Sequence, residues 1–146
     1  MTLRYVLFVT SLFGCSALHT SAVAAEGFDG QWKGTISCAK LSFTKGPFKT
    51  AIDMTVDKGA VTYTRDVYNR DGSRVVGTEE GKGTIGDGGK LTLTATWKST
   101  EERPRFTYTA SYAGSFKGNA ANLKGTQVWS FDGKTENRAC TIALKR

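Results

Sequence analysis

The sequence predicts an all-β protein, an eight-stranded antiparallel up-and-down β-barrel closed by one disulfide. Apolar residues recur at every second position through much of the chain, which is the spacing of strands that bury one face. Short runs rich in Gly, Asp and Asn separate these alternating segments, as turns separate the strands of hairpins. A cysteine stands in the first segment, Cys38, and another in the last, Cys140. Together these features predict consecutive strands that form one closed sheet.

The first predicted strand covers residues 31–39 and places its apolar side chains on one face. Trp32, Ile36 and Cys38 fall on that face, because side chains alternate along a strand. Polar residues occupy the intervening positions. The pattern predicts a half-buried strand whose apolar face contacts the core.

Three further strands are predicted in the first half of the chain, separated by turn sequences. Residues 57–59 and 71–72 have the Asp and Gly content typical of tight turns. The last of the three strands is predicted to be interrupted by its glycines, Gly77, Gly81 and Gly83. The predicted ranges are 48–56, 60–69 and 74–85.

Four more strands are predicted in the second half. The first of these has the cleanest alternation in the chain, with Leu91, Leu93 and Trp97 on one face. A charged loop at residues 99–104 follows it. The four predicted ranges are 90–98, 105–117, 121–131 and 138–146.

Pairing of the first and last strands would complete the barrel. Strands joined by short turns form a meander, and an even number of strands lets the first and last run antiparallel. Closure also removes the two exposed edges of an open sheet. If Cys38 and Cys140 lie opposite one another, the antiparallel register places Trp32 close to Arg146.

Residues 1–25 are predicted to be a secretory signal peptide that is removed. Arg4 supplies the positive start, an apolar stretch follows, and residues 22–25 offer a small-residue cleavage site. The remaining residues, 26–146, have the length of a single domain. We therefore expect a periplasmic or secreted protein without a transmembrane segment. A lipoprotein anchored at Cys15 is the alternative.

Cleavage would leave Cys38 and Cys140 as the only cysteines and would remove His19, the only histidine. An exported chain with two cysteines predicts one disulfide. Without histidine, a Ser-His-Asp triad, a Cys-His pair and a histidine metal site are all excluded. We expect no metal, no cofactor and no enzymatic activity.

The mature chain is basic, with nineteen Lys and Arg against thirteen Asp and Glu. This charge would attract anionic partners such as envelope polymers, acidic proteins or nucleic acid, or it would serve solubility alone. Runs of Lys and Arg do not exceed two residues. We therefore favour solubility and find no strong nucleic-acid signal. The sequence leaves the oligomeric state open.

The triplet Gly30-Gln31-Trp32 resembles the G-x-W signature of the calycin barrels, which include lipocalins, avidins and small bacterial metalloprotease inhibitors. The wider frame with its terminal-strand cysteines is similar to uncharacterised small exported bacterial proteins. The resemblance implies a barrel in which a basic residue of the last strand packs across Trp32, here Arg146 or Lys145. It implies little about function, because calycins bind unrelated molecules.

Aromatic and polar residues of the predicted inner face form the candidate ligand site. An eight-stranded barrel is either filled by side chains or just wide enough for one small ligand. The pattern is thus consistent with a pocket or with a filled core, and a filled core is the more common outcome. Small residues between the large ones, and an inward amide that needs a partner, favour a cavity. The candidate ligand-binding residues are Tyr63, Arg65, Trp97, Tyr108, Tyr112, Gln127 and Trp129.

Arg65 is expected to pair with a glutamate of the next strand, Glu79 or Glu80. A two-residue turn at 71–72 places Glu80 on the face of Arg65, whereas one extra turn residue aligns Arg65 with Glu79. The register is open. An inward pair would be buried and able to orient a polar ligand, whereas an outward pair would be a weak surface interaction. We expect the outward orientation.

The same two glutamates argue against catalysis. Adjacent residues of a strand point to opposite faces, so Glu79 and Glu80 cannot act together on one bond.

The predicted function is that of a non-enzymatic exported binding barrel for a small apolar or aromatic ligand. One alternative is a protein-binding inhibitor barrel directed against an extracellular protease or lysozyme, acting through the loops at residues 40–47 and 99–104. Another is a structural envelope interaction module that uses the basic exterior.

Overall fold

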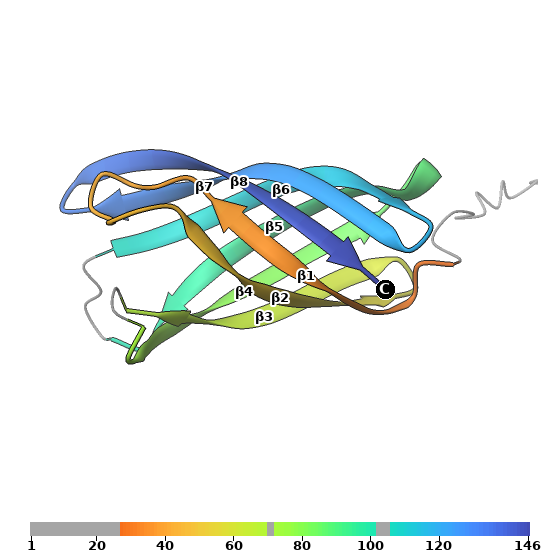
Figure 1. Cartoon of the computed structure of the whole chain (residues 1–146), viewed down its shortest axis with the longest axis horizontal. Coiled ribbons are helices and arrows are strands. Elements are labelled where there is room, and N and C mark those ends of the chain that lie inside the picture. The colour runs from red at the N-terminus through yellow and green to blue at the C-terminus, as the bar shows by residue number, and fades with distance from the viewer. Residues whose placement is uncertain (1–26, 70–71, 102–105) are drawn as a thin grey trace, which may run out of the picture.

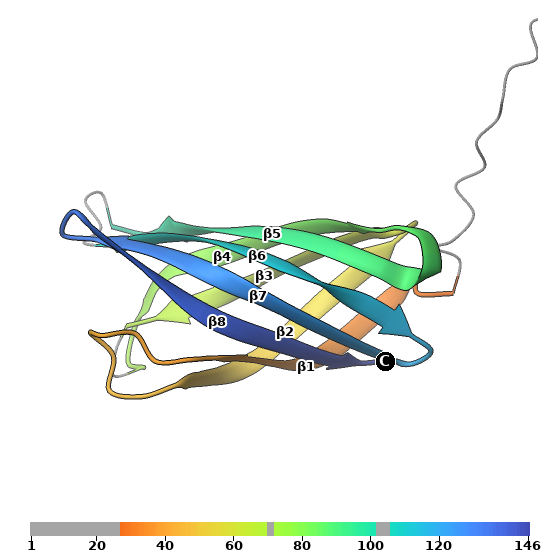
Figure 2. The same ribbon diagram turned by 90° about the horizontal axis from the view of Figure 1, so that it is seen from above.

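The computed structural model describes residues 27–69, 72–101 and 106–146, and its strands form one closed antiparallel barrel in sequence order. Each strand pairs with the next, and the first pairs with the last (Figures 1 and 2). The predicted eight-stranded up-and-down barrel is confirmed. The strands are β1 (Gly30–Cys38), β2 (Phe48–Asp57), β3 (Ala60–Tyr68), β4 (Val75–Ile85), β5 (Lys90–Ser99), β6 (Phe106–Lys117), β7 (Ala120–Phe131) and β8 (Lys134–Lys145).

The observed strand ends agree with the predicted ones to within one residue, except at the start of β8. We predicted that this strand begins at residue 138, but it begins at Lys134. Asp132 and Gly133 both have positive φ angles, and Phe131 pairs with Lys134. This is the geometry of a two-residue hairpin turn, which lets pairing start directly after the turn. The predicted signal peptide, including Cys15, lies outside the described residues.

The two ends of the barrel differ in what they carry. The terminal end holds residues 27–29, Arg146 and the short 3₁₀ turn Asp87–Gly89 (Figure 1). The loop end carries the connection at residues 39–47 and the turn at residues 132–133 (Figure 2). Within the described part of the chain, no helix has the length and apolar character needed to cross a lipid bilayer.

Trp32 seals the terminal end. Its side chain is fully buried and lies edge-on to Phe116, with ring centroids 4.6 Å apart. Its indole Nε1 donates a hydrogen bond to the carbonyl oxygen of Phe28 at 2.7 Å. The Arg146 guanidinium lies 5.5 Å from the Trp32 ring centroid and donates to the carbonyl oxygens of Gly27 and Asp29. The predicted contact between Trp32 and a terminal basic residue is confirmed, and that residue is Arg146.

The disulfide joins the first strand to the last. Cys38 and Cys140 are directly opposite in the β1–β8 register, and their sulfur atoms are bonded. Both side chains are buried. The two cysteines are 102 positions apart in the sequence, and their bond links the two strands whose pairing closes the barrel.

The interior is filled at the terminal end and changes character toward the loop end. An apolar cluster from all eight strands occupies the terminal half, with Trp32, Ile36, Leu93, Phe116 and Ile142 among its members. A second cluster, rich in aromatic residues, lies at the loop end. A layer of buried polar side chains, which includes Glu79 and Gln127, separates the two.

We expect the disulfide to contribute about 4–5 kcal/mol to the free energy of unfolding, because it restricts the unfolded chain over a loop of this length. Urea denaturation of the oxidised protein and of the Cys38→Ala/Cys140→Ala double variant measures this difference. The barrel register is retained by backbone pairing along β1 and β8, so the variant should keep the far-ultraviolet spectrum of a sheet. Equal unfolding midpoints would contradict this role of the bond.

Candidate ligand-binding site

A cavity of about 930 Å³ occupies the loop end of the barrel. Its walls are inward side chains of the strands, and part of its rim is the segment from Phe43 to Phe48. Its volume lies at the upper end of the range typical of small-molecule sites. The sequence left a pocket and a filled core as alternatives, and the interior has both: a filled terminal half and a cavity at the loop end.

Aromatic rings from three adjacent strands form one wall of this cavity. Tyr108 of β6 and Trp129 of β7 are directly paired in register, and their ring centroids are 4.3 Å apart. Trp97 of β5 stacks on Phe106 at 5.0 Å with an interplanar angle of 16°. Phe43 reaches over from the 39–47 connection and packs against the edge of Trp129. The rings therefore support one another as a continuous aromatic wall.

Glycines of β4 make room for large rings instead of breaking the strand. β4 runs uninterrupted from Val75 to Ile85, so the predicted interruption is wrong. A Cβ placed on Gly77 would lie 2.2 Å from the Trp97 indole nitrogen, and one on Gly81 would lie 2.0 Å from the Tyr63 ring. In each case the absent side chain is replaced by an aromatic ring from a neighbouring strand.

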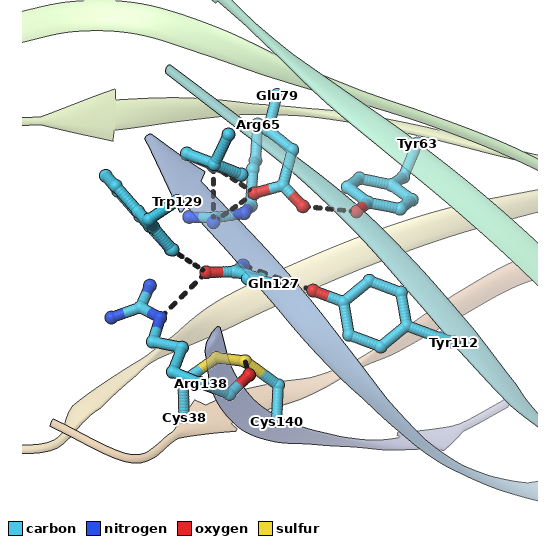
Figure 3. The surroundings of a disulfide bond; sticks show 10 residues. Cys38, Tyr63, Arg65, Glu79, Tyr112, Gln127, Trp129, Arg138 and Cys140 are labelled. Carbon is cyan, nitrogen blue, oxygen red and sulfur yellow. Dashed lines mark hydrogen bonds and ion pairs between the residues drawn. A yellow bond between two sulfur atoms is a disulfide. The ribbon is translucent and has the colours of Figure 1, made fainter. Parts of the chain in front are cut away.

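Glu79 is the centre of the buried polar layer. Its carboxylate has no exposed surface and accepts three hydrogen bonds (Figure 3). The hydroxyls of Tyr63 and Tyr108 each donate at 2.5 Å. Arg65 completes the set through an ion pair and a hydrogen bond. Charge-assisted hydrogen bonds of this kind replace the water that a buried carboxylate loses.

The orientation predicted for Arg65 is wrong. Arg65 pairs with Glu79 in the β3–β4 register, and both side chains point into the barrel. Val67 pairs with Gly77 but Tyr68 pairs with Val75, so Val76 is an extra residue in β4, and this irregularity shifts the register by one residue and brings Arg65 opposite Glu79. Glu80 points outward and contacts Lys98 at 2.6 Å. An outward ion pair does exist, but it is that of Glu80.

The buried environment fixes the protonation states of this layer. Burial, together with the neighbouring Glu79 carboxylate, raises the pKa values of Tyr63 and Tyr108 well above the ordinary value for tyrosine. Burial also raises the pKa of Tyr112. Burial alone would lower the pKa of Arg65, but the adjacent Glu79 carboxylate outweighs it and the pKa is raised. The three tyrosines are thus neutral, Tyr63 and Tyr108 donate to the carboxylate, and Arg65 is a permanent cation.

Gln127 forms a second polar centre beside the first (Figure 3). Its Oε1 accepts hydrogen bonds from Trp129 Nε1 at 3.0 Å and from Arg138 Nε at 2.8 Å. Its Nε2 donates to the hydroxyl of Tyr112 at 3.1 Å. The side chain is completely buried. The buried amide therefore has the partners that the sequence required of it, and it holds Trp129 in place in the aromatic wall.

The seven predicted site residues come together, but at two depths. Four of them line the cavity directly: Arg65, Trp97, Tyr108 and Trp129. The other three, Tyr63, Tyr112 and Gln127, lie in the polar layer next to it. Gln127 is hydrogen-bonded to the lining residue Trp129, whereas Tyr63 and Tyr112 are hydrogen-bonded to Glu79 and Gln127 within the layer.

Two important lining residues were missed. Arg138 is only 7% exposed and lines the cavity, and the Phe48 ring lies against it. The sequence carried a signal for Arg138, because it stands two residues before Cys140 and so shares its inward face. Phe48 opens β2, directly opposite Cys38. Because Phe48 is the first residue of a strand, the alternation of the sequence did not indicate that its ring lines the site.

Among residues 27–69, 72–101 and 106–146, no group of three His, Cys, Asp or Glu side chains is arranged to hold a metal ion.

Comparison of this chain with protein-family models, with curated proteins and with solved structures found no match.

Replacing Glu79 by Gln should destabilise the protein by about 3–5 kcal/mol, because it leaves the buried Arg65 cation without its counter-charge. The matched control is Glu80→Gln on the neighbouring, outward position, where loss of an exposed pair with Lys98 should cost less than about 1 kcal/mol. Urea denaturation measures both. Similar losses in the two variants would show that Glu79 is not the buried anchor described here.

The free energy of unfolding should fall as the pH rises above 10. Below that value Tyr63, Tyr108 and Tyr112 are protonated in both states, so their contribution is intact. Above it the unfolded chain releases protons that the folded chain retains, which costs about 1.4 kcal/mol per pH unit for each tyrosine. Denaturation at a series of alkaline pH values measures the slope, and Tyr112→Phe should reduce it. Phenolate absorbance that titrates identically in the folded and urea-unfolded protein would contradict the pKa shifts.

Proposed function

We propose that this protein is a non-enzymatic exported binding barrel that holds a small apolar or aromatic ligand in its loop-end cavity. The observation that carries the proposal is the division of the interior. The terminal half is filled with apolar side chains, whereas the loop end has a cavity of about 930 Å³ bounded by stacked aromatic rings. Such a cavity excludes water from an apolar ligand while polar groups at its inner end fix the ligand's orientation.

The rigidity of the aromatic wall supports a binding role. Trp129 is held by its hydrogen bond to Gln127, and Tyr108 by its hydrogen bond to Glu79. These rings therefore need little reordering when a ligand arrives, and a preformed site loses less conformational entropy on binding. Aromatic faces also bury large areas per side chain.

The resemblance to calycins and the predicted export agree with this proposal. Calycin barrels take ligands into the barrel, and the closed eight-stranded meander found here is compatible with that fold. The disulfide between Cys38 and Cys140 suits an oxidising compartment such as the periplasm or the extracellular space.

The inhibitor and envelope-module alternatives remain predictions, and the contacts of the loop end favour the cavity over the first of them. The backbone N–H and hydroxyl of Ser42 both donate to the Glu136 carboxylate, and Leu41 is fully buried. The 39–47 connection is thus anchored to the barrel as a rim. The other loop proposed for an inhibitor, 99–104, extends into residues that the structure does not describe.

An uncharged fluorescent dye tests the proposal. N-phenyl-1-naphthylamine should bind saturably, with a rise in its own fluorescence and quenching of Trp97 and Trp129. Thr50 lines the cavity and Ala51, next along β2, is exposed, so Thr50→Phe should weaken dye binding at least about tenfold through steric exclusion. Ala51→Phe should leave binding unchanged. Both variants should be checked for wild-type thermal unfolding. Absence of saturable binding to the wild-type protein would refute the proposal.

A further inference from the structure

Among the described residues, the inner end of the cavity holds two guanidinium groups, those of Arg65 and Arg138, and one carboxylate, that of Glu79. Arg65 is neutralised by its ion pair with Glu79. Arg138 instead donates its Nε hydrogen bond to the neutral amide oxygen of Gln127. The ion pairs formed among the described residues involve Arg65, Arg74 and Lys98, and not Arg138. Within the described residues, Arg138 thus has no ion-pair partner at the inner end of the cavity.

The two cations are held close together around one ring. The guanidinium carbons of Arg65 and Arg138 each lie 5.3 Å from the centroid of the Phe48 ring. Arg138 also lies 5.0 Å from the centroid of Trp129. Aromatic faces stabilise a cation but do not neutralise it, and a guanidinium stays charged in proteins. The Arg65 cation nearby and the burial of the Arg138 side chain both raise the free energy of the Arg138 charge. A bound anion would offset this cost.

Arg138 also retains hydrogen-bonding capacity. A guanidinium has five N–H donors, and within the described residues the hydrogen bond of Arg138 uses only the one on Nε. Its side chain lines the cavity. The terminal N–H groups match the planar, two-point geometry of an oxyanion such as a carboxylate or a sulfonate.

We propose that the ligand of this barrel is an amphipathic organic anion, whose anionic oxygen group binds Arg138 at the inner end of the cavity and whose apolar body lies along the aromatic wall. This inference rests on the proposed function and adds the charge of the ligand to it. Trp129 links the two parts of the site, because it contacts the Arg138 guanidinium and also forms part of the aromatic wall.

Two dyes that share an aromatic body separate this inference from the proposed function. 1-Anilinonaphthalene-8-sulfonate carries an anionic group, and N-phenyl-1-naphthylamine is its uncharged parent. Arg138→Gln should weaken binding of the sulfonate about tenfold or more, since it removes a charge-assisted hydrogen bond, and should leave binding of the uncharged dye within about twofold. Arg138→Lys, which keeps the charge, should recover part of the sulfonate affinity.

Lys124→Gln is the matched control for the basic surface. Lys124 is exposed on β7 and does not line the cavity. Its replacement changes the net charge by the same amount and should alter the affinity for either dye by less than about twofold. A retained affinity for the uncharged dye also shows that the Arg138→Gln cavity is folded.

Each outcome separates the two proposals. If Arg138→Gln weakens both dyes equally, or leaves the sulfonate affinity unchanged, the anionic ligand is refuted while the binding barrel stands. If Lys124→Gln weakens the sulfonate as much as Arg138→Gln does, general surface attraction explains the effect and the inference is refuted. If neither dye binds the wild-type protein, the proposed function fails, and the inference fails with it.

Discussion

The buried carboxylate of Glu79 is the constraint on which the rest of the interior depends. A charge without solvent contact is stable only if donors surround it. Here the donors come from two strands, with Tyr63 and Arg65 on β3 and Tyr108 on β6. Because each donor must stay in place, the carboxylate fixes the β3–β4 register and positions the inner end of the cavity. It also prevents the apolar core from extending to the loop end.

Closure of the barrel makes this polar layer possible. The disulfide and the β1–β8 pairing join the first and last strands into a continuous wall, so the sheet shields the interior from solvent around the whole circumference of the barrel. At the terminal end Trp32, Phe116 and Arg146 form a seal of ring packing and hydrogen bonds. With one end sealed and filled, the space that remains is confined to the loop end.

The composition of that remaining space indicates what it can bind. Stacked rings provide a dry, rigid surface, and Gln127 holds one of them while also accepting a hydrogen bond from Arg138. An excess guanidinium at the inner end of an aromatic cavity is unfavourable in isolation, because burial penalises an unpaired charge. The inference of an anionic ligand rests on this charge.

Alternation, turn residues and the two cysteines determined the fold from the sequence alone, because the side-chain period of a strand and its hairpin turns are local properties. They also determined the disulfide and the contact of Trp32 with Arg146, which follow from antiparallel pairing of the terminal strands. Tertiary structure decided the inward orientation of Arg65, since that depended on one extra residue of β4 in the β3–β4 pairing. The tertiary structure also decided that the loop end holds a cavity and that the Phe48 ring lies against Arg138. These features depend on how side chains from strands far apart in the sequence pack together inside the barrel. The local sequence of one strand does not specify which side chains of the other strands fill the interior beside it.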